Sequence, residues 1–199
     1  YRTGYRFDLP VLARLIEGSG ALLAVDATQS LGVVPVPSAA CDFLVATTQK
    51  WLLGPHGLGV FYWNRRRRPE VEPASIGWYS VVDDLQFPYE LKPDAGRFEL
   101  GGLNWLGLYA LETGLDLLLD IGIERIEQHA LTLGGRLLDA LAGLDLELMT
   151  PPQPALRAGI VSWLDPACAA TAQALAGRGA LVTGSSGRVR ASTHLYNDA

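Results

Sequence analysis

The first half of the chain combines one helical pattern with short, continuously apolar runs. Residues 8–20, DLPVLARLIEGSG, predict a helix that Asp8 caps and that ends near its closing glycines. Apolar runs follow at residues 21–26 (ALLAVD), 41–50 (CDFLVATTQK) and 57–63 (GLGVFYW). Continuous apolar runs of this length are typical of strands buried on both faces of a parallel sheet. The first half is therefore predicted to be an α/β domain.

The pattern of apolar and polar residues changes in two steps, first after residue 70 and again beyond residue 100. Residues 70–96 are rich in proline, acids and aromatics without a steady period, so we interpret them as a long surface excursion. Two helical patterns follow at residues 103–120 and 123–144, and the remainder alternates short strand and helix patterns. These patterns predict a first domain at residues 1–100. An interdomain helix and a small α+β domain are predicted at residues 101–199.

Composition narrows the class of protein. The apolar stretches are interrupted by charges well short of a bilayer span and no export leader is evident, so we expect a soluble, cytoplasmic protein without a membrane partner. The net charge of −5 argues against a nucleic-acid partner, and the basic run Arg65–Arg68 is interpreted as a solvent-exposed strand cap. Cys41 and Cys168 lie far apart without metal-ligand spacing, which predicts a reducing compartment and no metal site.

The two lysines of the chain, Lys50 and Lys92, limit where amine chemistry can occur. Arginine, which supplies the other basic side chains, stays protonated and forms no imine at neutral pH. Lys92 lies in the polar segment ELKPD, whereas Lys50 lies among apolar and small residues in TTQKWLLGP. Lys50 is therefore predicted to be a Schiff-base lysine.

A pyridoxal cofactor needs more than this amine. It requires an acid for the pyridine nitrogen, donors for the phosphate and a cation for the substrate carboxylate. Asp26 ends an apolar run, where a carboxylate needs a positive partner, although a helix cap or an ion pair would also account for it. Gln29 follows in the same turn, and the hydroxyls of Thr47 and Thr48 precede Lys50. Each residue alone has an ordinary structural explanation, so the prediction depends on their combination.

Four motifs occur in one order along the chain: VDATQSLG at 25–32, DFLVATTQKWLLGPHGLGVFY at 42–62, RFELGGLN at 97–104 and VRASTHLYN at 189–197. Together they resemble the class V aminotransferase family of fold-type I pyridoxal-phosphate enzymes. The resemblance implies the C-terminal part of a mainly parallel-sheet large domain followed by a small α+β domain. It covers about the last half to two-thirds of such an enzyme, and we expect the chain to be incomplete at both ends.

The resemblance assigns cofactor roles to individual residues. Lys50 would carry the internal aldimine, Asp26 would pair with the pyridine nitrogen and Gln29 would contact the phenolic oxygen. Thr47 would take the position of the phosphate-binding hydroxyl, and the backbone amide of Gly102 would contact the phosphate of a neighbouring subunit. These roles imply pyridoxal 5'-phosphate as the cofactor and a homodimer as the assembly.

The resemblance also implies a substrate site. Arg190 in VRAS matches the arginine that binds the substrate carboxylate, with Arg188 on the same strand face as the weaker alternative. Asn104 would shape the site near a subunit boundary. The chain departs from the family at Gln49, where many relatives have histidine, and at Gly102, where relatives often have threonine.

These features predict an enzyme acting on an amino acid as its small-molecule substrate, either an aminotransferase or an epimerase-like enzyme, in which Lys50 moves the α-proton. A cysteine desulfurase is less favoured because residues 181–192 contain no cysteine, and Cys168 is expected to be buried in a helix. The alternative is a truncated, non-catalytic relative that serves as a folding or dimerisation module. The substitutions Gln49 and Gly102 and the missing upstream segment support that alternative.

Overall fold

The computed structural model describes residues 1–198 and divides the chain into two compact units. One unit comprises Leu9–Thr28 and Pro37–Asp116, and we call it the sheet unit. The other comprises Tyr1–Asp8, Gln29–Val36 and the chain from Leu117 onward, and we call it the C-terminal unit. The domain boundary expected near Gly101 stays a prediction.

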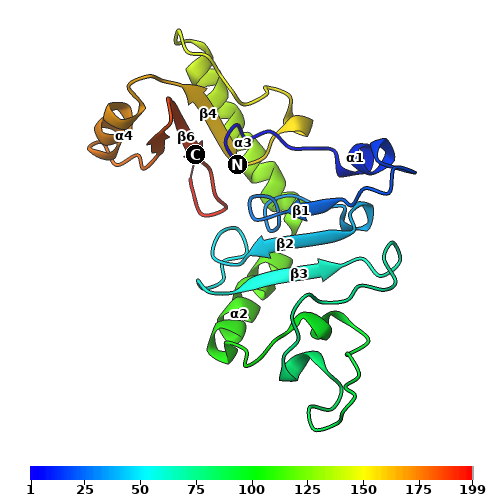
Figure 1. Cartoon of the computed structure of the whole chain (residues 1–199). Helices are drawn as coiled ribbons and strands as arrows, with labels where there is room; N and C mark the ends of the chain where they lie inside the picture. Colours follow the sequence, from blue (N-terminus) through cyan, green and yellow to red (C-terminus); the bar gives the residue numbers. More distant parts are fainter. Residues whose placement is uncertain (199) are drawn as a thin grey trace. The chain divides into compact units, whose positions relative to one another are not determined.

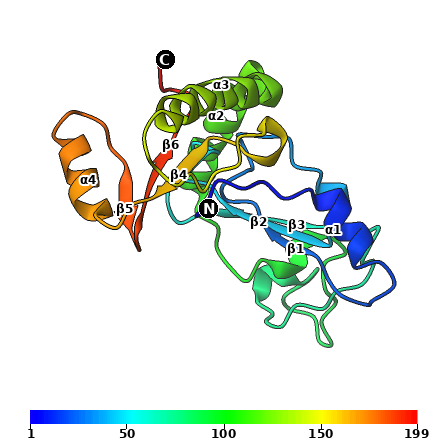
Figure 2. The same cartoon turned by 90° about the horizontal axis from the view of Figure 1, so that it is seen from above.

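The sheet unit contains helix α1 (Leu9–Leu15) and a three-stranded sheet (Figure 1). The strands are β1 (Ala24–Asp26), β2 (Phe43–Thr47) and β3 (Gly59–Trp63), in the order β1-β2-β3 (Figure 1), and they overlap when seen from above (Figure 2). The strands β1 and β2 are parallel, whereas β3 runs antiparallel to β2. The fold is α/β as predicted, but these strands do not confirm a mainly parallel sheet.

The sheet is not covered evenly on its two faces in the described chain. Leu44 and Ala46 on β2 are buried, whereas Val45 is 44% exposed and Phe61 on β3 is 40% exposed. The alternation follows from strand geometry, because neighbouring side chains point to opposite faces. The expectation that these runs are buried on both faces is therefore wrong for the described chain.

The buried carboxylate of Asp42 anchors the start of β2. It accepts hydrogen bonds from Leu23 N at 2.7 Å and from the Nε atoms of Arg67 at 3.2 Å and Arg68 at 3.1 Å. Burial raises the pKa of Asp42, but the Leu23 amide and the two guanidinium groups outweigh it, so the pKa is lowered from its ordinary value. Two of the four consecutive arginines thus neutralise a buried charge rather than only capping a strand.

The segment between β3 and the first long helix holds short 3-10 helices at Trp78–Ser80 and Ala95–Phe98. Ser80 is fully buried, and its hydroxyl donates to Glu99 O at 2.8 Å and accepts from Gly77 N at 3.0 Å. Helix α2 (Trp105–Ile121) follows. The excursion predicted from composition therefore has a defined internal structure.

The C-terminal unit pairs helices with an antiparallel sheet of order β4-β6-β5. Its elements are α3 (Ile123–Ala142), β4 (Ile160–Leu164), α4 (Cys168–Ala176), β5 (Thr183–Ser185) and β6 (Arg188–Ser192). Gly122, with φ of 89°, separates α2 from α3.

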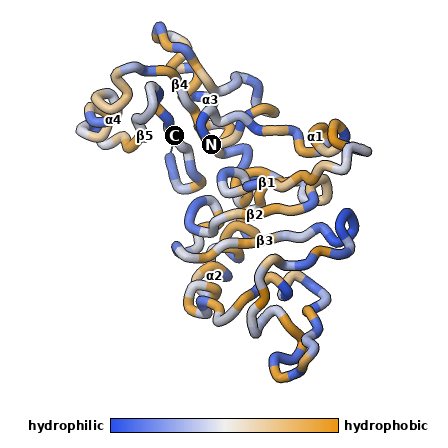
Figure 3. Tube along the Cα trace, viewed as in Figure 1, coloured by the Kyte–Doolittle hydropathy of each residue, from blue (hydrophilic) through white to orange (hydrophobic). Residues whose placement is uncertain are grey.

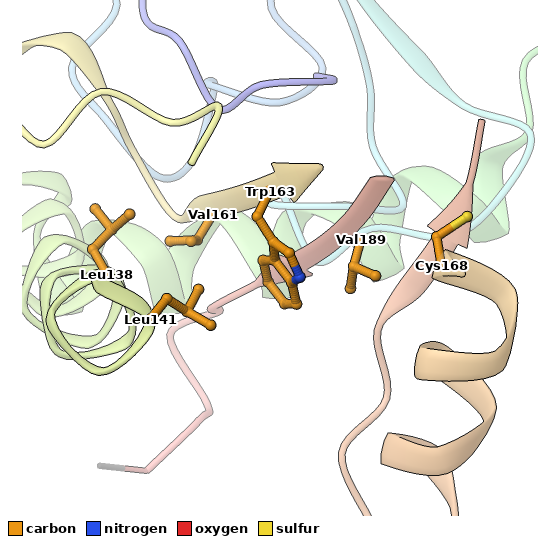
Figure 4. Packing of buried hydrophobic residues seen from close by; sticks show 6 residues of the cluster. All are labelled: Leu138, Leu141, Val161, Trp163, Cys168 and Val189. Carbon is orange, nitrogen blue, oxygen red and sulfur yellow. The ribbon is translucent and has the colours of Figure 1, made fainter. Parts of the chain in front are cut away.

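The apolar face of α3 covers β4. The core cluster consists of Leu138, Leu141, Val161, Trp163, Cys168 and Val189 (Figure 4). Cys168 is buried, as expected for a small residue in a helix. Hydrophilic residues are interspersed with hydrophobic ones along the chain (Figure 3), and within residues 1–198 no helix is long and apolar enough to cross a membrane.

Candidate functional site

The loop that carries Lys50 follows β2 and is held tightly from within. Thr48 is fully buried; its Oγ1 donates to Pro55 O at 2.7 Å, and its carbonyl accepts from Gly54 N at 2.9 Å. A Cβ atom at Gly54 would lie 2.7 Å from Thr48 Cβ and 2.8 Å from Leu111 Cδ1. Glycine is therefore required there. The Lys50 side chain itself is exposed.

Asp26 lies at the end of β1, beside the end of the parallel strand β2. Thr28 N donates to Asp26 Oδ1 at 3.0 Å. Hydrogen bonds from the Thr28 side chain and backbone lower the pKa of Asp26, burial opposes them weakly, and the charge of Lys50 lowers it further. Asp26 is thus an ionised carboxylate at neutral pH, near a lysine at the carboxyl edge of the two strands.

Thr47 also lies at this edge. Its backbone N donates to Thr28 Oγ1 at 3.1 Å, so the hydroxyl of Thr28 links Thr47 to Asp26. Its own Oγ1 is buried and has no hydrogen-bond partner among residues 1–198. Because buried hydroxyls normally find partners, this atom is suited to a ligand oxygen. The neighbouring Thr48 hydroxyl is occupied within the loop, which separates two threonines that the sequence alone presents as equivalent.

These groups fit pyridoxal phosphate by their chemistry. Lys50 supplies an amine, Asp26 an ionised acid, and Thr47 a hydroxyl without a partner in the described chain. They correspond to the aldehyde, the pyridine nitrogen and the phosphate of that cofactor. The sheet unit therefore brings three predicted cofactor-binding residues to one edge.

Two further predicted residues flank the start of α2 in the same unit. Asn104 Oδ1 accepts a hydrogen bond from Gly107 N at 3.0 Å, so Asn104 serves as the helix cap. A Cβ atom at Gly102 would meet nothing within 4 Å, so packing does not require glycine there. Their predicted roles towards substrate and phosphate stay predictions.

Gln29 and Arg190 belong to the C-terminal unit. Gln29 is half-buried in the turn after β1. Arg190 lies on β6, where its Nη2 donates to Thr183 Oγ1 at 3.4 Å and its Nε is buried without a partner among the described residues. The guanidinium carbon lies 4.5 Å from the centroid of the Tyr1 ring.

Sequence reasoning missed two residues, Thr28 and Tyr1. The spacing of Thr28 from Asp26 matches a turn in which an aspartate side chain bonds the backbone two residues later, which is the signal that could have found it. No sequence signal points to Tyr1, because its contact with Arg190 joins opposite ends of the chain.

Among the described residues, no three His, Cys, Asp or Glu side chains gather where they could hold a metal ion.

The family model described as "Aminotransferase class-V" matches residues 2–198. A curated relative, the uncharacterized aminotransferase YcbU of Bacillus subtilis, is 29% identical over 199 residues, which cover 99% of this chain and 53% of the relative. Other curated relatives are named probable cysteine desulfurase and kynureninase.

Solved structures confirm the type of fold. The apo cysteine desulfurase of Thermococcus onnurineus NA1 superposes with a TM-score of 0.85 at 30% identity, covering 98% of this chain and 53% of that one. A lysine-to-alanine mutant of the protein C-DES superposes with a TM-score of 0.82 at 23% identity, covering 100% of this chain and 55% of that one. In that protein, glycine is covalently linked to the pyridoxal-phosphate cofactor. The chain spans about half the length of these relatives.

Proposed function

Because the chain belongs to the class V aminotransferase family, we propose that Lys50 is the amine that attaches to pyridoxal phosphate in an enzyme acting on an amino acid. One observation carries the proposal. The ionised Asp26, the buried Thr47 hydroxyl without a partner in the described chain, and Lys50 lie at one edge of the sheet unit. A structural role alone would not require this combination of groups.

When bound, pyridoxal phosphate supplies an electron sink for negative charge that develops beside the substrate amino group. In the proposed site, Lys50 Nζ would hold the cofactor, and it is the group that would accept the α-proton of the substrate. Asp26, whose pKa is lowered, would keep the pyridine nitrogen protonated, and the Thr47 hydroxyl, which has no partner among residues 1–198, would donate to the phosphate. Gln29 is assigned to the phenolic oxygen and Arg190 to the substrate carboxylate.

The reaction we favour is transamination or epimerisation at the α-carbon. A cysteine desulfurase needs an accessible cysteine, and residues 181–192, which comprise β6 and the segment just before it, contain none. Cys168 is buried in the core of the C-terminal unit, where it serves packing. The absence of a mobile cysteine therefore disfavours sulfur transfer, although some relatives are named probable cysteine desulfurases.

A non-catalytic module is the second candidate. Its support is that Gln49 replaces the histidine of many relatives and that Gly102 stands where relatives often have threonine. Such a module would retain the fold without binding the cofactor specifically. The two candidates therefore differ in whether Lys50 reacts selectively.

We further propose that the intact protein is a homodimer. The sheet unit exposes many large apolar side chains around α2 and the preceding segment, a set that we call the apolar patch: Trp78, Leu85, Phe87, Tyr89, Leu106 and Tyr109. Exposed apolar surface of this extent is typical of interaction sites, and a second copy is the occupant we propose. Gly102 and Asn104 lie within the same stretch of sequence.

Reduction with borohydride tests the proposed function. The intact protein is mixed with pyridoxal phosphate and reduced, and the labelled lysine is identified by peptide mass spectrometry. We expect the label at Lys50, its loss in Lys50→Ala and its retention in the matched control Lys92→Ala. Equal labelling of both lysines would favour the non-catalytic module, and no label at Lys50 would refute the cofactor assignment.

A further inference from the structure

We propose that Tyr1 is a positioning residue that holds the guanidinium of Arg190 ready for the carboxylate of an amino-acid substrate. This inference rests on the proposed function, which assigns that carboxylate to Arg190. The guanidinium carbon lies 4.5 Å from the centroid of the Tyr1 ring. At this distance the face of an aromatic ring attracts a guanidinium and restricts its orientation.

The segment that carries Tyr1 is fixed to the C-terminal unit. Thr150 Oγ1 donates to Thr3 O at 2.6 Å, and Arg6 N donates to Leu156 O at 2.8 Å. A Cβ atom at Gly4 would lie 2.2 Å from Ile160 O, so the backbone passes too close to β4 for any other residue. Tyr1 is therefore presented by a backbone that is anchored just beyond it.

Thr150, which holds the N-terminal segment, is also connected to the strand pair that carries Arg190. The hydroxyl of Thr150, which donates to Thr3, also accepts from Ser162 N at 2.8 Å. Ser162 is the partner of Arg190 in the antiparallel pairing of β4 with β6. A short path of hydrogen bonds thus fixes the N-terminal segment to the strand beside Arg190, and the position of the ring relative to the guanidinium follows from the fold.

One guanidinium donor of Arg190 is buried without an acceptor in the described chain. Nη2 donates to Thr183 Oγ1 at 3.4 Å, whereas Nε is buried and has no acceptor in residues 1–198. Leaving a buried donor unsatisfied is costly, so an arriving acceptor oxygen is favoured there. A carboxylate offers two oxygens that match the spacing of guanidinium donors. Tyr1 and Thr183 together hold the Arg190 guanidinium, and its Nε–H remains able to donate to a carboxylate oxygen.

The side-chain contacts also distinguish Arg190 from Arg188, the weaker candidate for binding the substrate carboxylate on the same strand face. In the described chain, the ring contact with Tyr1 and the side-chain hydrogen bond to Thr183 are made by Arg190. An arginine held by two neighbours loses less side-chain freedom when a carboxylate binds. The arrangement therefore favours Arg190 as the carboxylate-binding residue and gives Tyr1 a share in that affinity.

Nuclear magnetic resonance of the Arg190 Nε–H group tests the inference without any reaction. The cofactor-free intact protein is titrated with acetate as a carboxylate probe. We expect Tyr1→Leu to weaken acetate binding at Arg190 by about tenfold, because a cation–aromatic contact is removed. Tyr1→Phe keeps the ring and should bind acetate as the unaltered protein does. Tyr5→Leu is the matched control, because the Tyr5 ring packs against Phe7 instead.

A second measurement uses the cofactor-loaded protein and L-alanine as the amino-acid probe. We expect Tyr1→Leu to raise the concentration for half-maximal change in cofactor absorbance by about tenfold, while borohydride labelling of Lys50 is unchanged. Unchanged acetate affinity in Tyr1→Leu, or an equal loss in Tyr1→Phe, would overturn the inference. Failure to label Lys50 in the unaltered protein would refute the proposed function alone, because the acetate titration still decides the role of Tyr1.

Discussion

Thr28 connects two residues of the candidate site through one hydroxyl group. Its Oγ1 accepts from Thr47 N at 3.1 Å, and its side chain and backbone both bond the carboxylate of Asp26. The hydrogen bonds keep the pKa of Asp26 below its ordinary value. Thr28 therefore orients both the acid assigned to the pyridine nitrogen and the strand end assigned to the phosphate.

We predict that Thr28→Val raises the pKa of Asp26 towards its ordinary value of 3.8, because the side-chain hydrogen bond is its largest lowering cause. A lowered pKa stabilises the folded protein above the ordinary value, and this contribution is lost as the pH falls through the lowered pKa. The carboxylate thus stays ionised at neutral pH in both proteins. Carboxyl carbon resonances followed between pH 2 and 6 measure the shift.

The same substitution should weaken pyridoxal-phosphate binding at neutral pH by about tenfold, because the loss of one side-chain hydrogen bond costs about 1 kcal/mol or more. Thr28→Ser keeps the hydroxyl and serves as the control. Equal cofactor affinity in Thr28→Val and the unaltered protein would show that Thr28 does not organise the site.

The sequence predicts Lys50 as the cofactor lysine because only two lysines occur and one lies in a motif that resembles the family. It could not reveal the role of Thr28, since the two partners of its hydroxyl meet only when β1 pairs with β2. It could not separate Thr47 from Thr48 either. That difference depends on which of the two hydroxyls the loop after β2 already uses.

At the level of elements, α2 supports the loop that presents Lys50. A Cβ atom at Gly114 would lie 2.9 Å from Leu52 O and 3.1 Å from Leu53 O. Leu53 itself has φ of 56°, in the left-handed region that costs free energy for a branched side chain. The close approach of the helix thus holds the backbone just after Lys50 in an uncommon conformation.

We predict that Gly114→Ala lowers the free energy of unfolding by about 1–3 kcal/mol through overpacking, which exceeds the gain of about 1 kcal/mol in helix propensity. It should also reduce the yield of labelled Lys50, because the loop must move. Urea unfolding and borohydride labelling measure the two effects. Gly143→Ala is the control, because its new Cβ atom would meet Ala140 O at an ordinary 3.8 Å. An unchanged or higher stability in Gly114→Ala would contradict the supporting role of α2.

The elements themselves were largely predictable. The apolar runs became β1, β2 and β3, and the helical periods became α2 and α3, because each run fits its secondary structure. Strand direction and burial were not predictable from the runs. Apolar residues such as Val45 and Phe61 suggest strands that are covered on both faces, yet these two residues remain exposed in the described chain. The apolar pattern therefore indicates more burial of the sheet than residues 1–198 provide.

At the scale of the whole molecule, the apolar patch gathers several of the most exposed apolar side chains of the described residues. Leu85 is 93% exposed, Phe87 is 88% exposed and Leu106 is 84% exposed. Burial of one such side chain contributes about 1.5–3 kcal/mol, so a second copy that covers several of them would form a stable dimer. The tightly hydrogen-bonded Ser80 fixes the short 3-10 helix that carries Trp78, which favours a defined partner surface.

We predict that the double substitution Leu85→Glu and Phe87→Glu weakens dimerisation of the intact protein by at least about a hundredfold, because two charges replace apolar contacts. Light scattering across a dilution series measures the change in mass. Leu181→Glu is the control, since Leu181 is 86% exposed and belongs to the C-terminal unit. A monomeric unaltered protein, or a variant with unchanged mass at every dilution, would refute the second copy as the occupant. Because Gly102 and Asn104 lie in the same stretch of chain as the patch, the dissociated variant should also release pyridoxal phosphate faster.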